Sequence, residues 1–248
     1  MCTLILLRRP GHDWPIILGA NRDEAKARPW RPPARHWPDR PEVVAGLDEL
    51  AGGSWLGVND HGVVAGILNR HGSLGPAPGQ RSRGELVLEA LDHADAADAA
   101  DAIAAIDPGA YRTFNMIVAD SRDAFWLRHA DDSGKSAVEA RPVKAGLSMI
   151  ASGEIDDATM PRLLKYRPFF EKAAVPDPVS GDWAAWQSLL SQDGGGPEDA
   201  LRFDTGRGFA TVSSALIAVP THDKPELEPR FRFRSYHPTL TDWVDISL

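Results

Sequence analysis

Two groups of short apolar runs, broken by turns, most limit the folds open to this chain. The first group comprises residues 3–8, 16–20, 54–59 and 63–69, the second comprises 113–120, 124–129, 137–143 and 147–151, and runs at 209–219 and 230–236 follow. Runs of this length, rich in β-branched residues and bounded by Gly, Asn and Asp, indicate strands joined by turns. Within each group we expect strands to follow one another without an intervening helix.

Helical patterns lie mainly between these strand groups. Ser82-Arg83-Gly84-Glu85 has the spacing of a capping box and predicts one helix that starts there and continues to about Ile106. Its alanines and leucines keep an apolar stripe through a low-complexity Ala-Asp repeat. Further helices are expected at 158–173, with a kink at Pro168, and at 182–191. Strand groups with a few helices between them predict an α+β layered fold, and the lack of a linker or repeat predicts one domain, 1–248.

Composition limits the classes of function. The chain has 43% hydrophobic and 25% charged residues, as ordinary globular proteins do, and its net charge of -8 disfavours a nucleic-acid partner. Two basic stretches are expected to be an extended loop (28–40) and the solvated face of an edge strand (Arg230, Arg232 and Arg234). The single cysteine excludes an internal disulfide, and no signal peptide or membrane-spanning run is present. These features predict a cytoplasmic protein with a small-molecule partner; they leave the oligomeric state open.

The single cysteine, Cys2, directly follows the initiator methionine. Removal of Met1 gives Cys2 a free α-amine, which titrates at roughly 7.7 to 8.0, beside a thiol that titrates near about 8.5. The amine can then act as the base for the thiol, as in N-terminal nucleophile enzymes. The alternative interpretation is that Cys2 is only a small apolar residue.

A block of polar residues, Asn21-Arg22-Asp23-Glu24, follows the apolar run 16–20 directly. In an extended chain Asn21 and Asp23 point to one side and Arg22 and Glu24 to the other. One face is therefore expected to hold an acid and an amide near Cys2. The alternative is a solvated loop with an exposed ion pair, which contributes little to stability.

Four sequence blocks resemble the NRDE family, the transport and Golgi organisation 2-like proteins. They are Met1-Cys2-Thr3, then Ala20 to Glu24 with Arg28-Pro29, then Gly52 to Asn59, and Ser82-Arg83-Gly84. Phe114-Asn115 extends the match weakly. This family is regarded as related to the N-terminal nucleophile cysteine hydrolases, the group of bile salt hydrolase and penicillin V acylase. The resemblance implies their four-layer αββα sandwich.

The resemblance to those hydrolases also implies roles for single residues. The nucleophile falls on Cys2, the active-site acid on Asp23 and an oxyanion-hole amide on Asn69. A preorganised N–H donor at a developing oxyanion contributes roughly 10² to 10³ in rate. The arginine of those enzymes falls on Ala20, and we expect the Arg22 side chain to point in a different direction from Ala20.

Two more positions depart from the hydrolase pattern. Ser152 stands where relatives carry asparagine, and Val212 stands where they carry arginine. We expect Asn21, Arg22, Trp55 and Asn59 to bind substrate.

The resulting prediction is an N-terminal-cysteine hydrolase that cleaves a small or non-peptide amide through a Cys2 thioester. The alternative is a non-catalytic carrier of haem or an acyl-type metabolite, since the animal family member is linked to haem trafficking and lipid metabolism. Cys2, His61 or His71 would then ligate the iron. No His-Glu-x-x-His or Cys-x-x-Cys motif is present, so neither a metal nor another cofactor is predicted.

Overall fold

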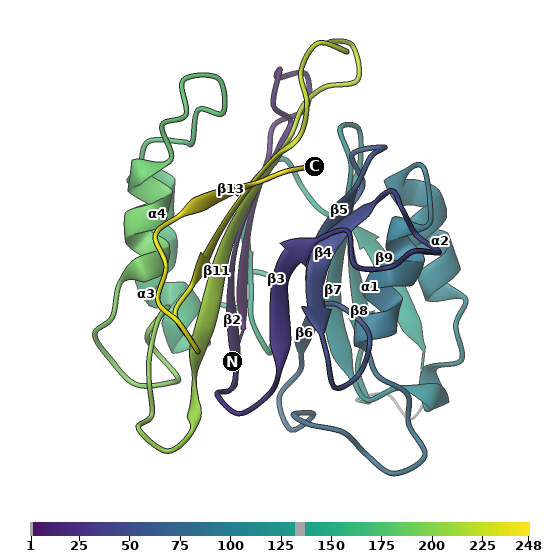
Figure 1. Cartoon of the computed structure of the whole chain (residues 1–248), viewed down its shortest axis with the longest axis vertical. Helices are drawn as coiled ribbons and strands as arrows, with labels where there is room; N and C mark the ends of the chain where they lie inside the picture. The colour runs from purple at the N-terminus through teal and green to yellow at the C-terminus, as the bar shows by residue number, and fades with distance from the viewer. Residues whose placement is uncertain (1, 132–136) are drawn as a thin grey trace.

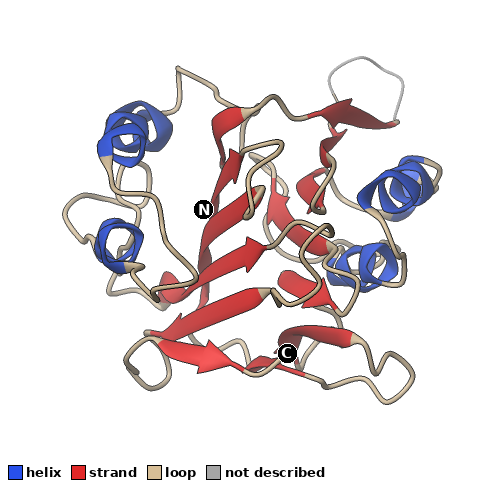
Figure 2. Cartoon of the chain, turned by 90° about the horizontal axis from the view of Figure 1, so that it is seen from above, coloured by secondary structure: helices blue, strands red, loops and turns tan. Residues whose placement is uncertain are grey.

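Two antiparallel sheets stack face to face, and helices cover both outer faces. The computed structural model describes residues 2–131 and 137–248, so Met1 lies outside the described residues. Figure 1 shows α3 and α4 on one flank and α1 and α2 on the other, and Figure 2 shows the same four layers from above. The predicted α+β class and the αββα order of layers are confirmed.

The first sheet has the strand order β10-β1-β2-β11-β12-β13. Its strands are β1 (Thr3–Arg8), β2 (Ile16–Ala25), β10 (Gly146–Ile150), β11 (Phe209–Val219), β12 (Arg230–Ser235) and β13 (Val244–Ile246). Thr3 lies opposite Asn21 in the β1–β2 register, so the polar block of β2 lies beside the start of β1. A register shift in β11 between Thr211 and Ser213 falls at the same end of the sheet.

The second sheet follows the chain strand by strand in the order β3-β4-β5-β6-β7-β8-β9. Its strands are β3 (Trp30–Ala34), β4 (Val43–Asp48), β5 (Leu56–Asn59), β6 (Val64–Asn69), β7 (Phe114–Ala119), β8 (Ala124–His129) and β9 (Val138–Pro142). Sequential antiparallel strands can be joined by short connections. The connection between β6 and β7 is longer, and the helices that it contains cover the outer face of this sheet.

Three buried apolar clusters correspond to the three interfaces between layers. The first fills the space between the sheets, and includes Leu4, Leu18, Leu56 and Ile117. The second lies under α1 (Gly84–Leu91) and α2 (Ala96–Ala104), which η1 (Pro108–Ala110) follows. The third lies under α3 (Pro161–Lys172) and α4 (Ala184–Ser191). Strand alternation explains the division, because successive residues point to opposite faces of a sheet.

The structure corrects several expectations about the elements. The single helix predicted to run from the block at 82–85 to about Ile106 is two helices, because Asp95 caps a new helix by accepting a hydrogen bond from the Asp98 N–H. Ser82 does not provide the predicted capping box, since the N-cap residue of α1 is Arg83. The loop predicted at 28–40 contains β3. β12 is an inner strand between β11 and β13, so its arginines do not lie on an edge strand.

None of the helices in the described part of the chain has the length and apolar character needed to cross a bilayer.

Candidate functional site

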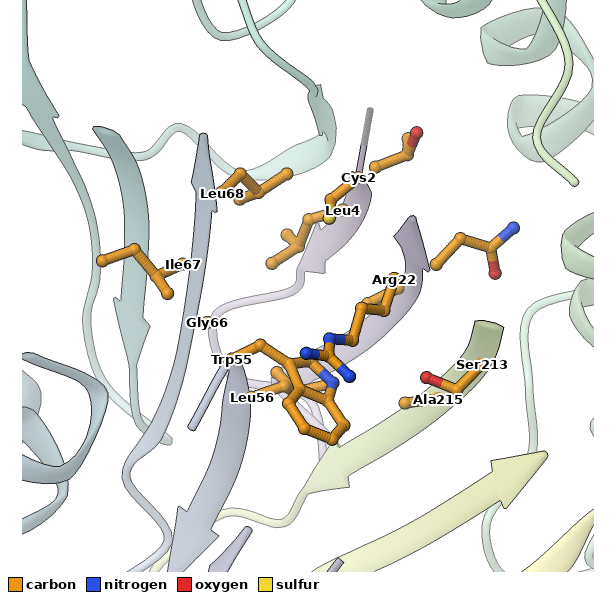
Figure 3. Close-up of a pocket in the computed structure, with 13 residues that line it drawn as sticks. Cys2, Leu4, Arg22, Trp55, Leu56, Gly66, Ile67, Leu68, Ser213 and Ala215 are labelled. Carbon is orange, nitrogen blue, oxygen red and sulfur yellow. The ribbon is translucent and has the colours of Figure 1, made fainter. Parts of the chain in front are cut away.

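A small cavity opens between the two sheets beside the start of β1. Cys2, Ala20, Arg22, Trp55 and Ser213 contribute to its lining, and the other lining residues are mainly apolar (Leu4, Leu56, Gly66, Ile67, Leu68 and Ala215). Figure 3 shows these side chains converging from both sheets. About 20 Å³ is available to the centres of water molecules, which is room for about one or two of them. Only a small group of a ligand enters this space without movement of the walls.

The Cys2 thiol is held by the backbone of the neighbouring strand. Its Sγ accepts a hydrogen bond from the Asp23 N–H, with an N–S distance of 3.3 Å, and lies 3.6 Å from the Asp23 carbonyl oxygen, to which it donates. Burial and the Asp23 carboxylate raise the pKa of the Cys2 thiol. A thiol in this environment stays protonated at neutral pH, so it needs a base before it can attack a carbonyl.

The Arg22 side chain lies on the cavity side of β2, like that of Cys2 on β1. Its guanidinium stacks on Trp55, with 3.9 Å between the guanidinium carbon and the ring centroid (Figure 3). Its Nη2 lies 3.8 Å from Glu24 and 3.9 Å from Asp48, while its buried Nη1 finds no hydrogen-bond acceptor among the described residues. The expected difference in direction from Ala20 is wrong, because residues two apart in a strand share a face and both line the cavity.

Two glycines allow close packing around Trp55: Gly46 lies against its ring, and Gly53 lies against the backbone of Gly84. A Cβ on Gly46 of β4 would overlap the Trp55 indole, so only glycine leaves room for that ring. A Cβ on Gly53 would overlap the backbone of Gly84, where the Ser54 N–H donates to the Gly84 carbonyl at 2.9 Å. The second contact joins two of the sequence blocks that resemble the family.

Arg83 brings a further cation toward the site. Its Nη1 donates to Ser73 Oγ and to the Thr113 carbonyl, both at 2.9 Å. Burial lowers the pKa of Arg83 to about 10, and the nearby Arg112 guanidinium contributes, while Cys2 and Glu24 oppose the shift. Arg83 does not line the cavity, and its link to the site is the electrostatic effect of Cys2 on its pKa.

The Asp23 carboxylate points away from the cavity, toward the helices that cover the first sheet. Its Oδ1 accepts from Thr211 Oγ1 at 2.6 Å, and its Oδ2 accepts from Arg162 Nη1 at 3.1 Å. Arg162 also donates to Thr3 Oγ1 and to the Pro197 carbonyl, each at 2.7 Å. The backbone of Asp23 therefore hydrogen-bonds to the Cys2 thiol, and its side chain hydrogen-bonds to Arg162.

The other predicted site residues are spread more widely. The Asn21 side chain donates to the carbonyls of Leu190 and Leu201, at 2.9 and 2.8 Å, although Asn21 contributes to the cavity wall. Asn59 lies outside the cavity, where its carboxamide joins the β5–β6 turn to the end of α1. Asn69 ends β6 directly after Leu68, which lines the cavity.

Two of the three positions that depart from the hydrolase pattern are buried. Ser152 and Val212 are 3% and 0% exposed. The two histidines considered as iron ligands are exposed and do not line the cavity; His61 lies 3.3 Å from Glu42. Among the described residues, no group of three or more His, Cys, Asp or Glu side chains is placed to hold a metal ion.

The sequence analysis missed Arg162 and Arg83 as members of the site. Arg162 gave a usable signal, because it occupies the same helical stripe as the buried Leu163, Tyr166 and Phe170. A charged residue within an apolar stripe needs a buried partner. Arg83 gave a weaker signal, since its block was interpreted as a helix start and as part of the family resemblance, with no role for the side chain itself.

The sequence that builds this site also matches a family profile. The profile of the Transport and Golgi organisation 2 family matches residues 1–176. The chain belongs to this family. The resemblance seen in the sequence blocks is thereby confirmed. No curated protein sequence matches the chain significantly.

Several solved structures share the fold of this family member. The N-acylethanolamine-hydrolyzing acid amidase ortholog of Caenorhabditis elegans has a TM-score of 0.57 and 15% identity, over 87% of this chain and 92% of that one. The C2A mutant of a conjugated bile acid hydrolase from Clostridium perfringens has a TM-score of 0.51 and 11% identity, over 99% and 92% of the two chains. The R18L variant of that hydrolase has a TM-score of 0.54 and 10% identity, over 98% and 92%. These similarities establish the fold.

Proposed function

We propose that this protein is an N-terminal-cysteine hydrolase that cleaves a small or non-peptide amide through a thioester on Cys2. The observation that carries the proposal is the position of Cys2 Sγ, which lines the cavity between the sheets and accepts a hydrogen bond from the Asp23 N–H. The fold is shared with proteins named as an amidase and a bile acid hydrolase, which supports amide chemistry.

The proposed reaction begins after removal of Met1. The α-amine of Cys2 takes the thiol proton, and the sulfur attacks the amide carbonyl carbon. The tetrahedral intermediate collapses when its C–N bond breaks, and the departing amine receives the proton from the α-ammonium group. Water, deprotonated by the same amine, then attacks the thioester, and the C–S bond breaks to release the carboxylic acid and regenerate the thiol.

Three groups, on Asp23 and Asn69, are proposed to support these steps. The Asp23 N–H is positioned to donate to the developing thiolate, because it already donates to Sγ. The carboxylate of Asp23, fixed by Arg162 and Thr211, holds this end of β2 against the start of β1. Asn69 is the proposed amide donor to the oxyanion, since it follows Leu68 at the end of β6.

The test is acylation of Cys2 by an activated ester, 4-nitrophenyl acetate. Protein that lacks Met1 should give a burst of about one nitrophenolate per chain and a mass increase of one acetyl group on the peptide that contains Cys2. Cys2→Ala should abolish both. Protein that keeps Met1 is the matched control and should lose the fast phase, because its Cys2 nitrogen is an amide and cannot act as the base.

The rival function, a carrier of haem, predicts a different result in the same preparation. Stoichiometric haem binding with no acylation of Cys2 would overturn the hydrolase proposal. The cavity beside Cys2 is much smaller than a porphyrin, so haem at this position requires the sheets to separate.

A further inference from the structure

The buried guanidinium of Arg22 has an unused donor. The Arg22 side chain is 5% exposed, and its Nη1 has no hydrogen-bond acceptor among the residues that the structure describes. A buried charged donor without a partner costs more than a neutral one, so such groups usually have an occupant. Because Arg22 lines the cavity together with Cys2, an acceptor that enters the cavity is the natural partner.

The neighbours of Arg22 fix which edge of the guanidinium is available. Trp55 covers one face of the planar group at 3.9 Å, and stacking of this kind leaves the N–H edges open for hydrogen bonds. Nη2 is directed toward the acidic pair, Glu24 at 3.8 Å and Asp48 at 3.9 Å. Asp48 in turn pairs with Arg28 at 2.7 Å. The acids therefore compensate one edge and leave Nη1 for a ligand.

The small volume and largely apolar lining of the cavity favour a carboxylate over a phosphate as the anion that Arg22 binds. The space admits about one or two water molecules, and its remaining walls are largely apolar. A carboxylate is small, planar and matched to guanidinium donors, whereas a phosphate is larger and more strongly hydrated. Continuation of the β1–β2 register places Cys2 opposite Arg22, so this anion would lie close to the thiol.

We propose that Arg22 Nη1 binds a carboxylate of the substrate, so that the amide attacked by Cys2 belongs to a molecule with a carboxylate close to the scissile bond. The assignment of a substrate class rests on the proposed hydrolase function. The carboxylate site itself does not, because it depends only on Arg22, Trp55 and the cavity.

The test compares the rates at which iodoacetate and iodoacetamide alkylate Cys2. Iodoacetate carries a carboxylate at the position where iodoacetamide carries a neutral amide. In each case the thiolate sulfur forms a bond to the methylene carbon and iodide leaves. Both reagents react with the same thiolate, so a change in the thiolate fraction alters both rates equally. The ratio of the two rates, measured at constant pH and ionic strength, therefore reports only the difference between the reagents. We expect Arg22→Gln to lower the iodoacetate-to-iodoacetamide ratio about tenfold relative to wild type, since the charge-assisted contact is lost.

Arg230→Gln is the matched control. It makes the same chemical change at a side chain that is 54% exposed on β12, outside the cavity lining, and should leave the ratio unchanged. An unchanged ratio in folded Arg22→Gln would overturn the proposal, and circular dichroism establishes whether that variant is folded.

A second measurement needs no variant. Sodium propionate should protect wild-type Cys2 from iodoacetamide, whereas propionamide and sodium chloride at the same concentration should not. Equal protection by propionate and propionamide would contradict a carboxylate site. If only the hydrolase proposal is wrong, Cys2 will not be acylated by the activated ester. The effect of Arg22→Gln on the rate ratio and the protection by propionate will still be observed.

Discussion

Replacement of Arg162 by methionine should destabilise the protein strongly. The Arg162 and Asp23 side chains are 2% and 0% exposed, and the pair is 3.1 Å apart. Arg162→Met removes the cation and also its hydrogen bonds to Thr3 and Pro197. Removal of one partner from a buried ion pair costs about 3 to 5 kcal/mol, because the other charge is left uncompensated. We therefore expect the free energy of unfolding to fall by about that amount.

Urea denaturation followed by tryptophan fluorescence measures this loss. With a slope of about 3 kcal/mol/M, the expected cost moves the midpoint down by about 1 to 1.7 M. Arg167→Met is the matched control on the same helix, since Arg167 pairs with Asp156 and Glu171 while its side chain is 35% exposed. Partly exposed pairs contribute about 1 kcal/mol or less. A loss for Arg162→Met no greater than that for Arg167→Met would refute the argument that the buried pair secures the start of β1.

Three further predictions concern the cavity and its supports. Gly46→Ala should cost about 1 to 3 kcal/mol in thermal or urea unfolding, because its new methyl group overlaps the Trp55 ring; an unchanged midpoint would show that the ring can move without cost. Asn59→Ala should cost about 1 to 3 kcal/mol and speed hydrogen exchange at the Val63 amide, which donates to Asn59 at 2.9 Å; slow exchange in the variant would argue against this role. In protein that keeps its initiator methionine, the rate of iodoacetamide alkylation of Cys2 should still rise above pH of about 8.5, because a raised pKa delays thiolate formation; a plateau below that pH would contradict the direction of the shift.

Short apolar runs bounded by turn residues made part of the fold predictable from the sequence. The strands Thr3–Arg8, Ala124–His129 and Phe209–Val219 were predicted with the bounds that the structure has. β3 was missed because Pro32-Pro33 removes two backbone donors and weakens a strand pattern. β2 continues to Ala25 through charged residues that a propensity argument assigns to a loop, and its neighbours β1 and β11 hold that segment in the sheet.

The candidate site was predictable only where it lies in local motifs. Cys2, Arg22 and Trp55 were identified from such motifs, and the structure gathers them around one cavity. The partners of Asp23 were not identified, because Arg162 and Thr211 lie 139 and 188 residues away in the sequence. Contacts over such separations depend on how α3 and β11 pack against β2, and local periodicity carries no information about that packing.

The central claim is that Cys2 becomes the first residue and uses its own amine as the base. The most direct test is the intact mass of protein produced from its native start codon without an N-terminal tag. The account predicts a mass lower by one methionine residue, with Cys2 as the first residue on N-terminal sequencing. Retention of Met1 in every molecule would contradict the account, because the Cys2 nitrogen would remain in a peptide bond and could not accept the thiol proton.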